Sequence, residues 1–177
     1  MPVTPMNASA MTYPFLMIFP FLMMYSAFSD LFTMTIPNRV SLVLLAGFPI
    51  LAFAVGVPLE TIGWHMTCGA GILTLTFSMF AMGWIGGGDA KLAAATALWL
   101  GWDHMLDFGF ITSLVGGGLT LFFLQLRRMP LPESLQTHIW IERLHNSANG
   151  VPYGIALAAA GLIVYPDSPV WLDAFVR

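Results

Sequence analysis

The sequence has few charged residues. Of its 177 residues, six are Lys or Arg and nine are Asp or Glu, so 8% are charged whereas 58% are hydrophobic. Soluble domains carry roughly 25% charged residues, so this chain has too few to cover a surface that faces water. This disfavours the alternative of an unusually apolar soluble protein. The net charge of −3 is too small to indicate nucleic acid as a partner.

The sequence also has little that could bind a metal or a phosphate. Its only cysteine, Cys68, excludes an internal disulfide and a CxxC zinc pair. The four histidines show no HExxH or similar spacing, and the GxxxxGK[ST] pattern of a phosphate loop is absent. We therefore expect no metal and no cofactor.

Long apolar runs dominate what is present. A helix needs about 20 apolar residues to cross a hydrocarbon core of about 30 Å. This predicts an all-α, polytopic membrane protein of about six transmembrane helices, formed by a single domain (1–177) with its core at 14–166. The predicted spans are 14–32, 40–57, 62–84, 89–102, 106–126 and 150–166. The fourth reaches only about 21 Å, so either the bilayer is thinner there or the glycine turn before it lies below the membrane surface.

The basic residues give the predicted spans an orientation. Five of the six lie at the odd-numbered connections or the adjoining helix ends, namely Arg39, Lys91, Arg127, Arg128 and Arg143. The positive-inside rule makes that side cytoplasmic, so we expect both termini outside. The longest polar connection, 128–149, is open to two interpretations. It is either a short amphipathic helix on the cytoplasmic face, built around Leu135, Ile139 and Leu144, or an ordinary solvated loop.

Two carboxylates lie at membrane depth. Asp30 ends the first predicted span, with no charged neighbour until Arg39, and Asp89 opens the fourth. Ionisable groups at such depth are costly and are candidates for function. The orientation places both at cytoplasmic ends of their spans, at the same depth. Taken singly, each has a structural alternative: Asp30 as a helix-end residue in the headgroup region, and Asp89 as a helix N-cap.

The pair predicts a chemistry. Two carboxyl groups about 3 Å apart share one proton, so one can deprotonate a water while the other polarises a peptide carbonyl. We expect Gly86, Gly87 and Gly88 to let a substrate strand approach and to form a turn that other residues would hinder. We expect the segment Ile36-Pro37-Asn38 to end the first cytoplasmic turn with a restricted backbone angle φ and to provide a polar cap for the next helix.

A non-catalytic protein is the alternative to a protease. It would be a transporter or assembly subunit that uses the Asp pair for protons. A proton carrier is expected to place ionisable groups near the bilayer midplane. None of the predicted spans has one there, which argues against this class.

At these residues the sequence resembles the type IV prepilin peptidases, membrane aspartyl proteases with a GxGD motif. Three blocks carry the resemblance, in order and with the expected spans between them. They are Asp30 followed after five residues by Ile36-Pro37-Asn38, then Gly86-Gly87-Gly88-Asp89-Ala90-Lys91-Leu92, and Val151-Pro152-Tyr153-Gly154-Ile155-Ala156. The resemblance implies that Asp30 and Asp89 are the catalytic pair, and that the chain lies in a bacterial inner membrane.

The resemblance also implies a substrate. It would be a prepilin or pilin-like protein whose short basic leader is cleaved at the cytoplasmic face. Larger members carry a cytoplasmic segment with paired cysteines and also N-methylate the new pilin terminus. This chain lacks both, so we do not expect methyl transfer, and its size is closer to the short peptidases of tight-adherence (Flp-type) systems. Archaeal preflagellin peptidases are a more distant possibility.

Supporting roles stay open for several motif residues. Lys91 could tune the aspartate pair or bind lipid phosphate, or it could be an ordinary basic anchor. Asn38 and Tyr153 could support the site, or they could simply pack at helix starts. Membrane lipid is an expected partner. The sequence gives no oligomeric state.

Overall fold

The computed structural model describes residues 15–132, 134 and 137–176, and within these ranges the chain is helical with no strand. The longer helices are α2 (Ile18–Thr33), α3 (Asn38–Val55), α4 (Leu59–Ala81), α5 (Gly87–Leu100), α6 (Met105–Leu126) and α9 (Gly154–Val164). Short elements are η1 (Trp102–His104), α8 (Ile139–His145), η2 (Tyr165–Asp167) and α10 (Pro169–Val176). The all-α fold class is therefore confirmed.

Each of the six predicted spans overlaps one of the longer helices. In the described part of the chain, two helices are long and apolar enough to cross a membrane, Asn38–Val55 and the continuous Trp102–Leu126. Two shorter apolar helices are Ile18–Thr33 and Gly154–Asp167. Six crossings therefore stay a prediction. The termini that we expect outside, residues 1–14 and 177, lie outside the described residues.

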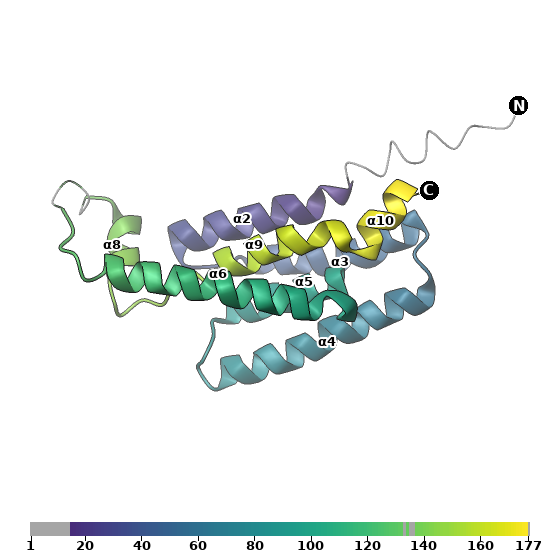
Figure 1. The fold of residues 1–177 in the computed structure, drawn as a ribbon, viewed down its shortest axis with the longest axis horizontal. Coiled ribbons are helices and arrows are strands. Elements are labelled where there is room, and N and C mark those ends of the chain that lie inside the picture. Colours follow the sequence, from purple (N-terminus) through teal and green to yellow (C-terminus); the bar gives the residue numbers. More distant parts are fainter. Residues whose placement is uncertain (1–14, 133, 135–136, 177) are drawn as a thin grey trace, which may run out of the picture.

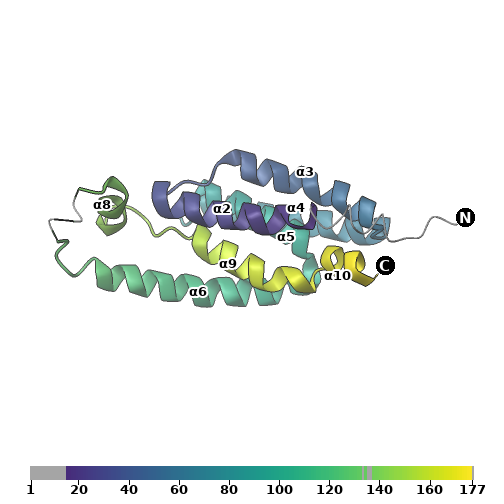
Figure 2. The ribbon, with the colours of Figure 1, turned by 90° about the horizontal axis from the view of Figure 1, so that it is seen from above.

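Helix α5 lies at the centre of the bundle. It packs against α3, α4 and α9, and α9 in turn packs against α2 and α6, as the views in Figures 1 and 2 show. Ten of the 14 residues of α5 are buried. Five of them are alanines, and small side chains let neighbouring helices approach closely where lipid supplies no hydrophobic driving force. The helix at the short fourth predicted span is therefore the core helix of the fold.

An aromatic cluster fixes the end of the bundle that lies far from α8. Trp99 of α5 is fully buried, and its ring lies 5.2 Å from Phe19 and 5.9 Å from both Phe48 and Tyr165. The Trp99 indole N–H donates to the carbonyl oxygen of Leu44 at 2.9 Å. This hydrogen bond satisfies the one polar group that the ring buries. Through the ring contacts, the cluster joins α2, α3, α5 and η2.

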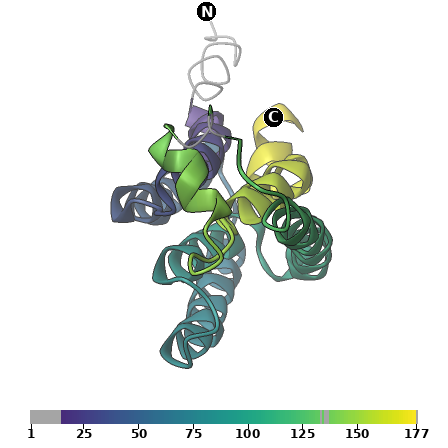
Figure 3. The ribbon, with the colours of Figure 1, turned by 90° about the vertical axis from the view of Figure 1, so that its left-hand side faces the viewer.

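Helix α8 lies across the other end of the molecule (Figure 3). Arg143 of α8 donates to the carbonyl oxygen of Thr33 at 3.1 Å, and Trp140 packs edge-on against Phe32 at 5.1 Å. Leu144 is buried while Ile139 is exposed. The connection 128–149 thus contains a seven-residue helix docked on the end of α2. Leu135 lies outside the described residues, and contact with a membrane surface stays a prediction.

Candidate active site

Asp30 lies in the last turn of α2. The helix ends at Met34, a C-cap in the left-handed region (φ 56°) whose N–H donates to the Asp30 carbonyl oxygen at 2.8 Å. The Asp30 side chain is only 6% exposed. Its Oδ2 accepts a 2.7 Å hydrogen bond from the backbone N–H of Gly154, 124 positions later. Asp30 is therefore a helix-end residue, as its structural alternative expected, but its side chain is buried against α9. Its depth relative to the lipid headgroups stays a prediction.

That hydrogen bond has a physical reason. Gly154 is the first residue of α9, and no side chain of α9's own N-cap residue supplies a capping bond. The first amides of a helix have no partner within it, and the helix dipole favours negative charge at this end. Asp30 therefore caps α9 from α2.

Asp89 lies in the first turn of α5, where Gly86 is the N-cap and Asp89 is the third helical residue. The interpretation of Asp89 as an N-cap is wrong by three positions. Its carboxyl group is half-buried and forms a hydrogen bond with the Gly86 backbone. A side chain at this position that reaches back to the N-cap amide satisfies one of the free donors, so the helix start orients Asp89.

The fold brings the two aspartates together. Helices α2 and α5 both pack against α9, and the Asp30 carboxylate lies within electrostatic range of Asp89. The two residues are 59 positions apart in sequence. Their proximity is set by α9, which contacts both helices, rather than by extensive packing of α2 on α5.

Ile36 lies between the start of α5 and the start of α9. It is 9% exposed. A Cβ added to Gly88 would lie 3.2 Å from Ile36 Cβ, and one added to Gly154 would lie 2.7 Å from Ile36 Cδ1 and 2.8 Å from Asp30 Oδ2. Real Cβ atoms essentially never approach other atoms to within 3.0 Å. Gly154 is therefore required by the close approach of α9 to Asp30 and Ile36.

The glycine triple does not form the turn that was predicted, and the approach of a substrate strand to it stays a prediction. None of its three residues has a positive φ; Gly86 is extended at φ −72°, and the left-handed residue of this turn is Gly83 at φ 75°. A Cβ on Gly86 would lie 2.9 Å from Asp89 Oδ2. The expected turn at these glycines, one that other residues would hinder, is therefore wrong, because Gly86 is the N-cap of α5 and the next two glycines are its first helical residues. They make room for Asp89 and Ile36 within the chain itself.

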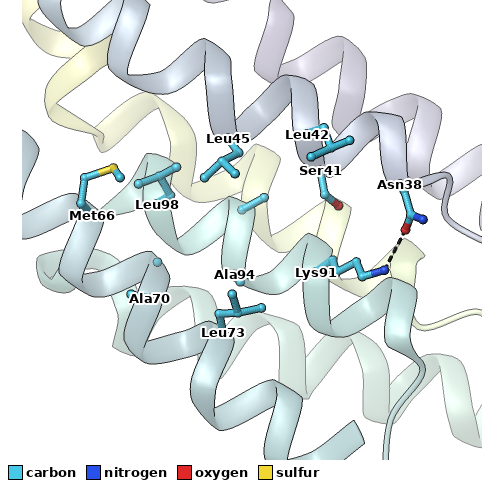
Figure 4. A pocket seen from close by; sticks show the side chains of 12 residues that line it. Asn38, Ser41, Leu42, Leu45, Met66, Ala70, Leu73, Lys91, Ala94 and Leu98 are labelled. Atoms are coloured by element: carbon cyan, nitrogen blue, oxygen red, sulfur yellow. Dashed lines mark hydrogen bonds between the residues drawn. The ribbon is translucent and has the colours of Figure 1, made fainter.

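The start of α3 is joined to α5. Pro37 is the N-cap of α3, with φ −62° and ψ 134° and no side-chain capping bond, so the expected polar cap from Asn38 is wrong. Instead the Asn38 side-chain oxygen accepts a 2.8 Å hydrogen bond from Lys91 Nζ, as Figure 4 shows. Lys91 therefore holds α3 against α5, two residues beyond Asp89.

Tyr153 and Pro152 precede α9. Pro152 is buried, and Tyr153 is the N-cap residue, close enough to Asp89 to interact electrostatically. The Tyr153 ring lies so near Gly116 of α6 that a Cβ there would have to displace the ring. Its hydroxyl donates weakly, at 3.4 Å, to the carbonyl oxygen of Thr112. Gly116, the first of three consecutive glycines in α6, was not predicted as a site residue.

The model of a known family covers the part of the chain that carries both aspartates. A model of the type IV leader peptidase family matches residues 17–121, more than half of the chain and both aspartates. The chain belongs to this family. The "Prepilin leader peptidase/N-methyltransferase" of Aeromonas hydrophila is 30% identical over 159 residues, which cover 85% of this chain and 47% of that protein. The chain spans about half the length of this curated relative. No solved structure matches.

Proposed function

We propose that this member of the type IV leader peptidase family is an aspartic endopeptidase that removes the leader from a prepilin or pilin-like protein. One observation carries the proposal: two carboxyl groups from separate helices lie within interaction range at one end of the bundle. One of them is held by the first amide of a third helix. Family membership supports the reaction class.

The geometry suggests how the pair would work. The Gly154 amide binds Asp30 Oδ2 at 2.7 Å and so fixes the plane of that carboxyl group, which leaves its other oxygen for a water. One carboxylate takes a proton from the water as the water attacks the peptide carbonyl carbon, and the protonated partner donates to the carbonyl oxygen. Breakdown of the tetrahedral intermediate breaks the C–N bond and returns a proton to the leaving amine. The two aspartates end as they began, sharing one proton.

The location follows from the proposed orientation. We propose six crossings of a bacterial inner membrane, both termini outside, and a site on the cytoplasmic side where a basic leader would enter. We propose leader cleavage without methyl transfer, since the sequence has one cysteine and therefore no cysteine pair like that of the larger members. We also propose Flp-type substrates, from the resemblance to the short peptidases of tight-adherence systems.

Cleavage can be tested in cells. The chain is co-expressed with a candidate prepilin, and leader removal is followed on a gel. Asp30→Asn and Asp89→Asn should each block processing while the protein stays in the membrane. The matched control is Asp107→Asn, an exposed carboxylate in the first turn of α6, which should process normally. Undiminished cleavage by either site variant would overturn the mechanism.

Orientation can be tested with single cysteines. Met129 and Asp103 are exposed at opposite ends of the α6 region, and the native Cys68 is buried. A thiol reagent that cannot cross the membrane, added from outside to intact cells, should label Asp103→Cys and spare Met129→Cys. The reverse pattern would invert the topology and separate the site from the leader.

A further inference from the structure

A groove lies on the side of α5 that faces α3 and α4. Both outer helices pack against α5 but contact each other little, and Figure 3 shows α4 standing away from the group formed by α2, α6 and α9. The groove has a volume of about 470 Å³. Its lining residues are Asn38, Ser41, Leu42, Leu45, Met66, Gly69, Ala70, Leu73, Lys91, Ala94, Ala95 and Leu98. The aspartate pair is not among them.

The polarity of the groove changes along its length. Lys91, Asn38 and Ser41 gather at one end, while Leu45, Met66 and Leu98 line the other (Figure 4). The polar end is the end of the bundle that holds Asp89, two residues before Lys91. A groove that is polar at one end and apolar beyond it has the polarity of a lipid, whose headgroup is charged and whose chain is not.

Lys91 has capacity to bind an anion. Its ammonium group donates to Asn38 at 2.8 Å, and no carboxylate in the described part of the chain pairs with it. An ammonium has three N–H donors, so two remain for a ligand. Near a membrane surface, a basic side chain attracts anionic lipid phosphate.

The length of the groove matches part of one acyl chain. From Asn38 to Leu45 and from Lys91 to Leu98 the groove follows seven residues of helix, or about 10 Å. That is about two thirds of one leaflet, because the whole hydrocarbon core is about 30 Å thick.

We propose that this groove holds one acyl chain of an anionic phospholipid whose phosphate binds Lys91. The lipid would fill the space that α4 leaves open and so support the packing of α3 and α4 on α5. This role is separate from peptide cleavage.

The full chain would be purified from bilayers that contain phosphatidylglycerol and phosphatidylethanolamine, and retained lipid would be counted by native mass spectrometry. The wild type should retain one phosphatidylglycerol in preference to phosphatidylethanolamine. Lys91→Met should lower that retention about fivefold, as expected for the loss of one basic contact. Ala70→Phe places a ring in the groove at an exposed position and should abolish retention.

Two controls separate lipid binding in the groove from a general effect of charge and from peptide cleavage. Arg128→Met removes an exposed basic residue outside the groove and should leave retention unchanged. Asp30→Asn should also keep the lipid, so loss of cleavage and loss of lipid are independent results. Equal retention of both lipids by the wild type, or full retention by Lys91→Met, would overturn the proposal. A photoreactive residue placed at Leu73 should cross-link to lipid. Cross-linking to a prepilin instead would also overturn the proposal, because the groove would then be a substrate-binding site.

Discussion

The substitution Gly154→Ala tests the geometry at the centre of the site. A methyl group at this position would lie 2.8 Å from Asp30 Oδ2 and 2.7 Å from Ile36 Cδ1. Because both separations are shorter than real Cβ atoms show, either Asp30 and Ile36 must retreat or α9 must shift. Each movement lengthens the 2.7 Å hydrogen bond between the Gly154 amide and Asp30.

The expected magnitude follows from that bond. A hydrogen bond to a charged group contributes about 1.5–3 kcal/mol, and a displacement of about 1 Å in a catalytic group can lower a rate about 100-fold. We therefore expect Gly154→Ala to cleave a prepilin about 10- to 100-fold more slowly. Overpacking costs about 1–3 kcal/mol, so thermal stability should fall as well.

The assay compares initial cleavage rates of the purified protein in bilayer discs, with thermal unfolding measured on the same samples. The matched control is Gly117→Ala in α6, where an added Cβ meets no heavy atom within 4 Å. This control should keep its rate, and its stability should be equal or higher, because alanine favours a helix over glycine by about 0.5–1 kcal/mol.

A second substitution separates the two clashes. Ile36→Val removes the Cδ1 atom that the new methyl group would meet, but leaves its contact with Asp30. In the Gly154→Ala background, Ile36→Val should restore part of the stability and little of the rate. If Gly154→Ala alone cleaves at the wild-type rate, the amide of Gly154 does not position Asp30 and the reasoning is refuted.

Two other substitutions test the packing around the site. Gly116→Ala should lower the free energy of unfolding by about 1–3 kcal/mol and slow cleavage, because the methyl group displaces the Tyr153 ring. In a Tyr153→Ala background, Gly116→Ala should no longer lower the free energy of unfolding. An unchanged loss of stability in that background would contradict this explanation. Trp99→Phe removes the 2.9 Å bond to the Leu44 carbonyl oxygen and leaves a void, so its melting temperature should fall by the equivalent of about 1–3 kcal/mol. An unchanged melting temperature would show that the cluster does not hold the bundle together.

The helices were largely predictable from apolar runs. The third longer helix was expected at 62–84 and lies at Leu59–Ala81, and the fourth was expected at 89–102 and lies at Gly87–Leu100. Their ends differ by two or three residues, because caps and turns decide where a helix stops. Helix α10 was not predicted, since its eight residues are too few to show a membrane-length run. The crossing of a membrane by all six stays a prediction.

The details of the site were not predictable in the same way. Asp30 and Asp89 stood out because a carboxylate is costly at membrane depth. No local pattern, however, links Asp30 to the amide of Gly154, 124 positions away. The glycines before Asp89 were interpreted as turn residues from their type, whereas in the structure they leave room for the side chains of Asp89, Phe80 and Ile36. Such contacts depend on which helices become neighbours, and hydropathy does not encode that.

The most direct test of the aspartate pair is a double-mutant comparison with purified protein in bilayer discs. Asp30→Asn and Asp89→Asn should each lower the single-turnover cleavage rate of a prepilin about 100- to 10,000-fold, the range of general acid–base catalysis. The double variant should be no slower than the slower single variant, because residues that act as one unit give non-additive losses. Losses that multiply in the double variant, or a wild-type rate in either single variant, would contradict a shared catalytic pair.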